Sequence, residues 1–233
     1  MAPSLSISMV LVAWSTSIFF YGTLPFDSAI PFVGASESSA LQLEAKALLK
    51  SGWWGRPTTS NASGHCKWRG ITCNASGSVT EIGIPFNLGE MSKLNLSSFP
   101  NLVRLDLHGT GLRGSIPAEI GTLSKLTYLD LSGNDLTGAL PLSLTNLTQL
   151  VVLNVSYNQI AGPIPSSLSL LIRLTNFVLY GNRINGFIPS EIGKLRYLVE
   201  LDLDQNMLTG PIPSTLGNLT NLKYLYLDRK SVV

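Results

Sequence analysis

The sequence predicts an α/β repeat solenoid, and two observations lead to this prediction. Leucines recur 24 residues apart without a slip, at Leu102, Leu126, Leu150, Leu174, Leu198 and Leu222. Each opens the motif L-x-x-L-x-L, with Val155 or Phe177 in place of a leucine in two copies, and its apolar residues alternate as they do in a half-buried strand. One such strand cannot bury its apolar side, whereas stacked copies bury a continuous core behind a parallel sheet. We therefore expect one elongated body whose function lies on a stacked surface rather than in a catalytic pocket.

Each repeat continues with an asparagine and then with a glycine and proline turn. The ninth position is asparagine in four copies, at Asn134, Asn158, Asn182 and Asn206. Its amide is expected to bond backbone groups that the turn leaves unpaired, so we predict a structural ladder rather than a binding site. The next motif of the repeat, Gly-x-Ile-Pro or Gly-x-Leu-Pro, recurs in five copies from Gly114 to Pro213. It closely resembles the plant-specific class of leucine-rich repeat. The resemblance implies a second short strand before the proline and a right-handed superhelix with a parallel concave sheet.

The first 35 residues differ in kind from the rest of the chain. Residues 9–20 form an uncharged apolar run that is too short for a membrane-spanning helix, which needs about 20 residues. The run is typical of a secretion signal, and the small residues Val33 and Ala35 predict cleavage after Ala35. Residues 1–35 are therefore interpreted as a signal peptide of a secreted, extracellular protein. Because no basic residue precedes the run, an uncleaved membrane anchor and a misassigned start remain alternatives.

Residues 36–78 are predicted to form a helical cap on the first repeat. Leu41, Ala45, Leu48 and Leu49 share one face of a helix that Gly52 ends. The tryptophans that follow are expected to pack in the cap, with stacking on a carbohydrate as the alternative. Residues 79–233 are assigned to the repeats, of which the last is incomplete.

Cys66 and Cys73 are the only cysteines, and in a secreted chain they most simply pair with each other. A zinc site that also uses His65 and His108 is conceivable, but the cysteine spacing matches no common zinc motif. We therefore predict a disulfide, no metal and no cofactor.

The cap narrows the resemblance to one family. The sequence A-L-L, then W, then C-K-W-R-G-I-T-C-N is similar to the N-terminal cap of plant leucine-rich-repeat receptor-like kinases. The stretches that begin at Gly77 and Ser97 resemble the subgroup of the male-discoverer-interacting receptor-like kinase, and the match spans residues 38–229. The family implies a truncated ectodomain, with its transmembrane and kinase regions beyond this chain. It also implies a secreted peptide or protein ligand and a leucine-rich-repeat co-receptor kinase. The Arg-x-Arg pair by which some relatives hold a peptide carboxylate is absent.

The register assigns variable positions on the strands to the concave, ligand-facing surface. They are Arg104, Asp106, His108, Tyr128, Asp130, Val152, Asn176, Tyr180, Glu200, Asp202 and Asp204. A simpler interpretation applies to Asp106, Asp130 and Asp202: they are exposed charges that only keep the strand edge in contact with water. Glu200, Asp202 and Asp204 form an acidic cluster that departs from the common Leu-Asp-Leu pattern of the strands. We expect this cluster to bind a basic peptide.

Six N-x-S/T sequons fit a secreted glycoprotein. They begin at Asn61, Asn74, Asn95, Asn146, Asn154 and Asn218. Asn154 is expected on the concave face, where a glycan would block part of a ligand groove.

No enzymatic motif appears in the chain. It has no glycine-rich phosphate loop, no H-R-D or D-F-G and no suggestive Ser, His and Asp set. The net charge of +2 and the absence of a basic stripe argue against nucleic-acid binding. The alternative function is a secreted inhibitor of cell-wall-degrading enzymes, similar to polygalacturonase-inhibiting proteins. That family has more repeats and a C-terminal cysteine cap, which favours the receptor interpretation.

Overall fold

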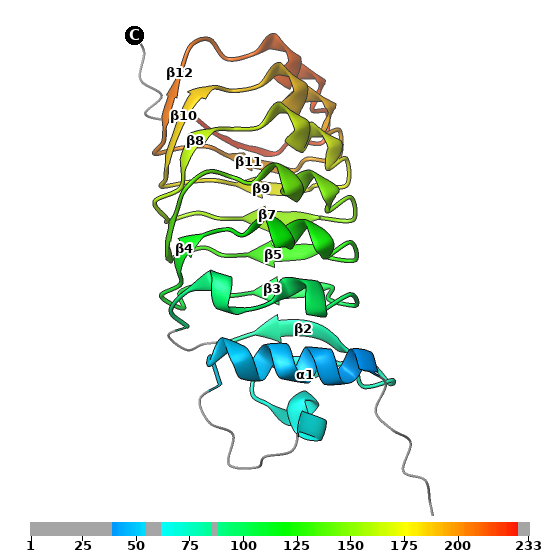
Figure 1. Cartoon of the computed structure of the whole chain (residues 1–233). Helices are drawn as coiled ribbons and strands as arrows, with labels where there is room; N and C mark the ends of the chain where they lie inside the picture. Colours follow the sequence, from blue (N-terminus) through cyan, green and yellow to red (C-terminus); the bar gives the residue numbers. More distant parts are fainter. Residues whose placement is uncertain (1–38, 55–61, 85–87, 228–233) are drawn as a thin grey trace, which may run out of the picture. The chain divides into compact units, whose positions relative to one another are not determined.

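The computed structural model describes residues 39–54, 62–84 and 88–227. The chain divides into two compact units, Met1–Ser36 and Glu37–Val233, and all the described residues belong to the second. The predicted signal peptide and the sequon at Asn61 lie outside them, so those predictions stay open. Within the described residues, stacked coils follow one another in sequence order (Figure 1).

An eight-stranded sheet runs along one side of the stack, with one strand from each coil and one, β1, from the cap (Figure 1). Its order is β1 (Ile71–Cys73), β2 (Val79–Gly83), β3 (Arg104–Asp106), β5 (Tyr128–Asp130), β7 (Val152–Asn154), β9 (Asn176–Val178), β11 (Glu200–Asp202) and β13 (Tyr224–Tyr226). Pairing is parallel from β2 to β13, as the 24-residue period predicts. The exception is β1, which pairs antiparallel with β2. The prediction of a parallel sheet therefore holds for the repeats, while a hairpin closes the sheet at the cap.

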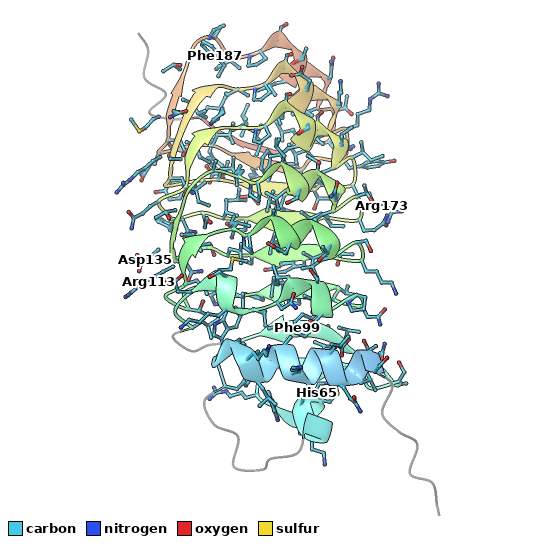
Figure 2. All side chains as sticks on the ribbon, viewed as in Figure 1. His65, Phe99, Arg113, Asp135, Arg173 and Phe187 are labelled. Atoms are coloured by element: carbon cyan, nitrogen blue, oxygen red, sulfur yellow. A yellow bond between two sulfur atoms is a disulfide. The ribbon has the colours of Figure 1, made fainter. Side chains whose placement is uncertain are left out.

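The second short strand implied by the Gly-x-Ile-Pro spelling is present. It forms a pair, β4 (Arg113–Ser115) with β6 (Asp135–Thr137), and a three-stranded parallel sheet of β8 (Ala161–Pro163), β10 (Arg183–Phe187) and β12 (Met207–Thr209). Figure 2 shows Arg113 and Asp135 side by side on this edge, where their charged groups lie 3.9 Å apart. The prolines end these strands, because a proline nitrogen has no hydrogen to donate.

Short 3-10 helices return the chain on the far side of the core. They are η2 (Met91–Lys93), η3 (Leu96–Ser98), η4 (Ala118–Thr122), η5 (Leu142–Asn146), η6 (Ser166–Leu170), η7 (Ser190–Lys194) and η8 (Ser214–Asn218), whereas η1 (Ala62–Lys67) belongs to the cap (Figure 1). The apolar residue at the equivalent place in each of η4 to η8 is buried, as the repeat pattern predicts: Ile120, Leu144, Leu168, Ile192 and Leu216. Leu142 and Leu170, in η5 and η6, are exposed instead. The core is therefore a continuous column between the sheet and these helices.

The asparagine ladder is formed as predicted. Asn158 accepts a hydrogen bond from the Leu136 backbone nitrogen at 2.9 Å and donates to the Leu131 carbonyl of the preceding coil at 2.9 Å. It also donates within its own coil, to the Val155 carbonyl at 3.0 Å. Asn134, Asn182 and Asn206 make the equivalent contacts. The ladder thus satisfies buried backbone groups of two adjacent coils at once.

The helix α1 (Ser39–Ser51) corrects one sequence prediction. Ala45 and Leu48 are buried as expected, but Leu49 is exposed and the charged Glu44 is fully buried. The buried face is therefore rotated toward Glu44, which accepts hydrogen bonds from Ser78 Oγ at 2.6 Å and from the Val79 backbone nitrogen at 2.9 Å. The polar side chain of Glu44, and not Leu49 as predicted, therefore lies on the buried face of the helix.

The disulfide between Cys66 and Cys73 is present as predicted. Nearby, the rings of Trp53 and Trp54 lie 6.3 Å apart, and those of Trp54 and Trp68 lie 5.9 Å apart. Trp53 is buried and belongs to the core, which favours packing over carbohydrate stacking for this residue.

Candidate ligand-binding surface

The outward side chains of the eight-stranded sheet and of the residues just after each strand form one continuous surface, which we call the concave face. Strand register brings equivalent positions of successive repeats side by side: Arg104 lies next to Tyr128, and Asp106 next to Asp130. Further along, Val152 and Glu200 flank Asn176 on its two sides. The predicted ligand-facing residues are therefore collected on one surface, and none of those on the strands is fully buried.

The N-terminal part of the concave face is a closed charge network centred on Asp106. This carboxylate lies 2.6 Å from Arg104 Nη2 and 2.7 Å from His108 Nδ1. Burial raises the pKa of Asp106, but the hydrogen bonds from His108 and Arg104 outweigh burial and lower it overall. The same contact, followed by Coulomb attraction to Asp106, raises the pKa of His108. Asp106 is thus neutralised by its own neighbours.

Tyr128 and Asp130 extend this network into the next two repeats. The Arg104 guanidinium carbon lies 3.5 Å from the centre of the Tyr128 ring, a cation–π contact. The Asp130 carboxylate accepts hydrogen bonds from Tyr128 Oη at 3.4 Å and from Asn154 Nδ2 at 3.2 Å. The aspartates at 106 and 130 are therefore ordered members of a side-chain network, which goes beyond the solvation of a strand edge.

The C-terminal part of the concave face carries acids without cations. Glu200 accepts a hydrogen bond from Asn176 Nδ2 at 2.6 Å, and Asp202 accepts one from the backbone nitrogen of Asp204 at 3.1 Å. Within the described ranges, no Lys, Arg or His lies within ion-pair distance of these three carboxylates. Burial, and then repulsion from Asp204 and Glu200, raises the pKa of Asp202. This end of the surface is consequently left with uncompensated negative charge.

An aromatic pair lies between these two parts; the sequence pattern assigned one of its members, Tyr180, to the concave face and missed the other, Tyr157. The rings of Tyr157 and Tyr180 meet edge to face with centroids 4.7 Å apart, and Tyr157 is 60% exposed. Tyr157 has φ +51°, a left-handed conformation that is filled by glycine at the equivalent positions 109, 133 and 181. The sequence did carry a signal for Tyr157, because it replaces the glycine found at the same position of other repeats. An aromatic pair with one exposed ring and one half-buried ring suits an interface.

The hollows on this surface are shallow and small. One of about 250 Å³ is lined by Gly83, Ile84, Asp106 and His108. Such a site suits a side chain of a larger ligand better than a small molecule, which needs a deeper enclosure.

The conceivable zinc site is not assembled. His65, Cys66 and Cys73 do place their ligand atoms within 4.8 Å of one another, but the two sulfur atoms are bonded to each other. His108, the fourth residue considered, is bound to Asp106 instead.

The sequons in the described part of the chain fall into two groups. Asn74, Asn95, Asn146 and Asn218 are exposed, whereas Asn154 is half-buried on β7. Asn154 lies on the concave face as expected, because its amide contacts Asp130.

Comparison with known proteins agrees with this architecture. Two leucine-rich-repeat family models match the chain, one over residues 100–160 and the other over 173–195 and 197–219. The chain is similar to the leucine-rich repeat receptor-like serine/threonine-protein kinase RGI4 of Arabidopsis thaliana, with 34% identity over 117 residues. This alignment covers 47% of the chain and 10% of the relative.

Two solved structures extend the likeness to the fold. The ectodomain of the Arabidopsis receptor kinase HAESA, in complex with an IDA peptide hormone, is 33% identical with a TM-score of 0.69. The match covers 83% of this chain and 34% of that one. A chain from the BIR3–SERK2 complex of Arabidopsis thaliana is 32% identical with a TM-score of 0.58, over 73% of this chain and 94% of that one. None of the helices in the described ranges combines the length and apolar character needed to cross a bilayer.

Proposed function

Because this chain is a leucine-rich-repeat protein similar in sequence and fold to ectodomains of plant receptor kinases, we propose that it is an extracellular ligand-recognition module. Its concave face binds a secreted peptide or protein, with the C-terminal part of that face receiving basic side chains. The chain spans about a tenth of the curated relative and about a third of the HAESA chain, so this assignment concerns the repeats alone.

The observation behind this proposal is the contrast in charge along one surface. At the N-terminal end, Asp106 already lies beside the Arg104 guanidinium and the His108 imidazole and offers little to a ligand. At the C-terminal end, the carboxylates of Glu200, Asp202 and Asp204 have no ion-pair partner among the described residues. A lysine or arginine of a ligand would relieve their mutual repulsion, so electrostatic complementarity favours a basic segment there.

The exposed Tyr157 and the half-buried Tyr180 extend this surface with apolar contact area. Tyr180 precedes the turn whose Gly181 nitrogen donates to the Asp204 carbonyl, so the aromatic pair and the acids occupy adjacent repeats. Aromatic rings beside carboxylates suit an arginine or lysine, because the stem packs on a ring while the charge meets an acid.

A second candidate partner is another receptor ectodomain. The match to the BIR3–SERK2 structure covers 94% of that chain, so a solenoid of this length exists in a complex between two such proteins. In this alternative the same surface contacts a folded ectodomain rather than a free peptide. Direct binding to the purified BIR3 or SERK2 ectodomain, without added peptide, would favour it.

The test uses the purified full chain and an array of synthetic 12-residue peptides balanced between basic and acidic sequences. The variant E200Q/D202N/D204N removes the concave charges while keeping side-chain size. The matched control E90Q/E119Q/E191Q removes the same charge at sites off the concave face. We expect the wild-type chain to retain basic peptides, with binding that weakens as salt rises.

The two triple variants separate the possible results. Loss of the basic preference only in the concave variant supports the proposal. An equal loss in both variants means that net charge alone attracts the peptides, and an unchanged preference in the concave variant means that the three acids have no binding role. Either of these results rejects the assignment.

A further inference from the structure

Apolar and basic side chains of two adjacent coils gather where η6 and η7 end. The backbone nitrogen of Val199 donates to the Thr175 carbonyl at 2.8 Å, so the two coils are in register just beyond these helices. Six exposed residues occupy three equivalent positions of the two coils, and we call them the basic patch: Leu170 beside Lys194, Ile172 beside Arg196, and Arg173 beside Tyr197. Figure 2 shows Arg173 projecting outward from this side of the stack.

The basic patch is confined to these two coils. At the same three positions, the flanking coils carry uncharged polar residues, which are Asn146, Thr148 and Gln149 in the coil of η5 and Asn218, Thr220 and Asn221 in the coil of η8. The repeat itself therefore requires neither bases nor exposed apolar side chains here. Exposed apolar residues grouped with arginine and tyrosine are typical of a binding surface.

The three cations of the basic patch have no ionic partner in the part of the chain that the structure describes. There, no carboxylate lies within ion-pair distance of Arg173, Lys194 or Arg196. By contrast, Arg104 and Arg113 each lie beside an aspartate. The patch consequently carries positive charge that an anionic partner can neutralise.

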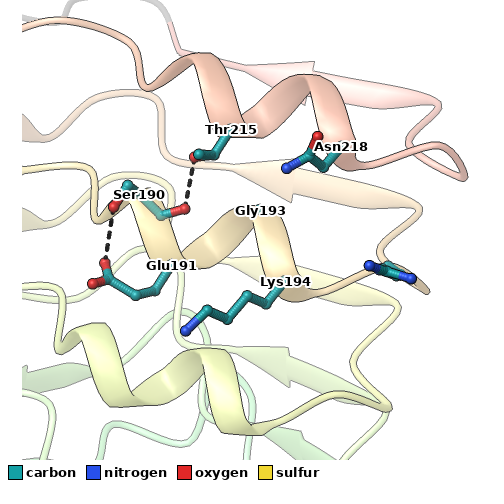
Figure 3. A pocket seen from close by; sticks show the side chains of 7 residues that line it. Ser190, Glu191, Gly193, Lys194, Thr215 and Asn218 are labelled. Atoms are coloured by element: carbon teal, nitrogen blue, oxygen red, sulfur yellow. Dashed lines mark hydrogen bonds between the residues drawn. The ribbon is translucent and has the colours of Figure 1, made fainter.

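A polar hollow of about 360 Å³ borders the basic patch between η7 and η8 (Figure 3). Lys194 and Arg196 line it together with Ser190, Glu191 and Thr215. The Thr215 hydroxyl donates to the Ser190 carbonyl at 2.6 Å, which ties the two helices together. Ammonium and guanidinium groups donate hydrogen bonds and the Glu191 carboxylate accepts them, so the hollow suits a ligand with both acidic and hydroxyl groups.

We propose that the basic patch and this hollow bind an acidic polysaccharide, a linear chain of uronic acid sugars. Such a polymer has a carboxylate on each sugar, which suits cations that lie on two coils spaced roughly 5 Å apart. Its carboxylates pair with Arg173, Lys194 and Arg196, and each arginine can do so through two parallel hydrogen bonds. The C–H faces of the sugar rings pack on the Tyr197 ring and on Ile172.

The hydroxyl groups of a sugar distinguish this ligand from other anions. A sugar hydroxyl can donate to Glu191, whereas an ionised phosphate or an acidic side chain has only acceptors to offer and is repelled. The basic patch lies on the helical side of the core, across from the sheet that forms the concave face. This inference therefore goes beyond peptide recognition, and either proposal can fail without the other.

The test is fluorescence anisotropy of labelled polygalacturonate with the purified full chain, in a chelator that prevents calcium from crosslinking the polymer. Methyl-esterified polygalacturonate keeps the sugars without the charge, and polyglutamate keeps the charge without the sugars. Asn218 borders the hollow and begins a sequon, so the T220A variant, which removes that sequon, is measured beside the wild type.

We expect polygalacturonate to bind more tightly than either control polymer, to the wild type or to the T220A variant. R173Q/K194Q/R196Q should weaken binding about tenfold, as three exposed ion pairs would. The matched K46Q/K50Q/K67Q removes the same charge from exposed sites in the cap and should leave the affinity within about twofold. Tyr197→Leu should weaken binding severalfold, whereas Tyr224→Leu, at an exposed tyrosine of β13, should not.

Three results would overturn the proposal. Equal binding of polyglutamate would mean that any polyanion, including an acidic protein, suffices. Equal losses in the two triple variants would mean that net charge alone attracts the polymer. Failure of both the wild type and the T220A variant to bind polygalacturonate would remove the site altogether.

Discussion

The carboxylate of Glu44 accepts a hydrogen bond from the backbone nitrogen of Val79 at 2.9 Å, across 35 positions of the chain. The same carboxylate accepts from Ser78 Oγ at 2.6 Å and lies 3.8 Å from His65 Nε2. One buried side chain thus joins α1 to the first strand of the parallel sheet and to η1. Val79 begins β2 and is fully buried, so its backbone nitrogen needs an acceptor within the protein, and Glu44 supplies it.

We predict that Glu44→Ala lowers the free energy of unfolding by about 1–3 kcal/mol, because it leaves the Val79 nitrogen buried without an acceptor. Glu44→Gln keeps one acceptor oxygen and should cost less. Urea unfolding followed by circular dichroism measures both, with the exposed Glu119→Ala as the control. Equal stability of the E44A variant and the wild type would show that water replaces the carboxylate.

The asparagine ladder gives a second stability prediction. Asn158→Ala removes one acceptor and two N–H donors, so the Leu136 nitrogen loses its acceptor and the Leu131 carbonyl keeps only its hydrogen bond from Asn134. We expect a loss of about 2 kcal/mol or more, since two buried backbone groups are affected. Asn185→Ala, at an exposed position outside the ladder, should change stability by less than about 0.5 kcal/mol. Comparing the thermal unfolding of the N158A and N185A variants tests whether stability depends on the hydrogen bonds of the ladder or only on the number of asparagines.

Two glycines at the same helix position should respond oppositely to alanine. A Cβ on Gly193 would meet the Thr215 carbonyl oxygen at 2.2 Å, whereas a Cβ on Gly217 would meet nothing within 4 Å. Gly193→Ala should therefore destabilise the chain by about 1–3 kcal/mol through overpacking. Gly217→Ala should be neutral or stabilise by up to about 1 kcal/mol. If both variants unfold at the same temperature, the close approach of η7 and η8 is not maintained in solution.

The repeat part of the fold was predictable because one pattern is written many times. Leu126, Leu150 and Leu174 each confirm the register of the others, so a local deviation such as Thr110 does not shift it. Thr110 is nevertheless buried, and its hydroxyl donates to the Leu107 carbonyl at 2.8 Å in place of the missing asparagine. The 24-residue period was therefore enough to predict the strands of the large sheet, the core and the asparagine ladder.

The cap and the side-chain network could not be predicted in this way. Helical spacing placed Leu49 on the buried face, because a single amphipathic turn cannot reveal that β2 needs a buried acceptor from Glu44. Similarly, L-D-L is spelled alike around Asp106 and Asp202. The deciding partners lie two residues away in the same repeat: Arg104 and His108 beside Asp106, and Glu200 and Asp204 beside Asp202. The period repeats the apolar positions and not these variable ones, so it does not report which aspartate is neutralised.

The His108–Asp106 pair should be visible in a proton titration. Their hydrogen bond, and then their Coulomb attraction, raises the pKa of His108 above its usual value of about 6.5. Asp130 adds to this effect and Arg104 opposes it. The pair therefore stabilises the fold fully below the unfolded pKa, and this contribution is lost as pH rises through the folded one.

We expect nuclear magnetic resonance to give a His108 midpoint above the usual value, which falls toward it in Asp106→Asn. The chain has two histidines, so His108→Asn identifies the resonance. A midpoint that does not move in the D106N variant would mean that the side chains are apart in solution.

Asp202 should destabilise the folded chain at neutral pH. Burial, followed by repulsion from Asp204 and Glu200, raises its pKa above the unfolded value, although the hydrogen bond from the Asp204 nitrogen opposes this. A carboxyl whose folded pKa is raised contributes stability below its unfolded pKa and loses it as pH rises through the folded value. Asp202→Asn keeps an oxygen for the Asp204 nitrogen and removes the charge, so it should raise the melting temperature at pH 7.

The matched substitution is Asp106→Asn on the equivalent strand position. The pKa of Asp106 is lowered in the fold, so its stabilising effect is present above the unfolded pKa and is lost as pH falls through the folded one. At pH 7 the D106N variant should melt below the wild type while the D202N variant melts above it. Near pH 3, where Asp202 is protonated in both states, the D202N variant should match the wild type. If the two variants shift the melting temperature in opposite directions at pH 7, the carboxylate of Asp106 is stabilised by its neighbours and that of Asp202 lacks a cationic partner. The same sign in both variants would remove that distinction.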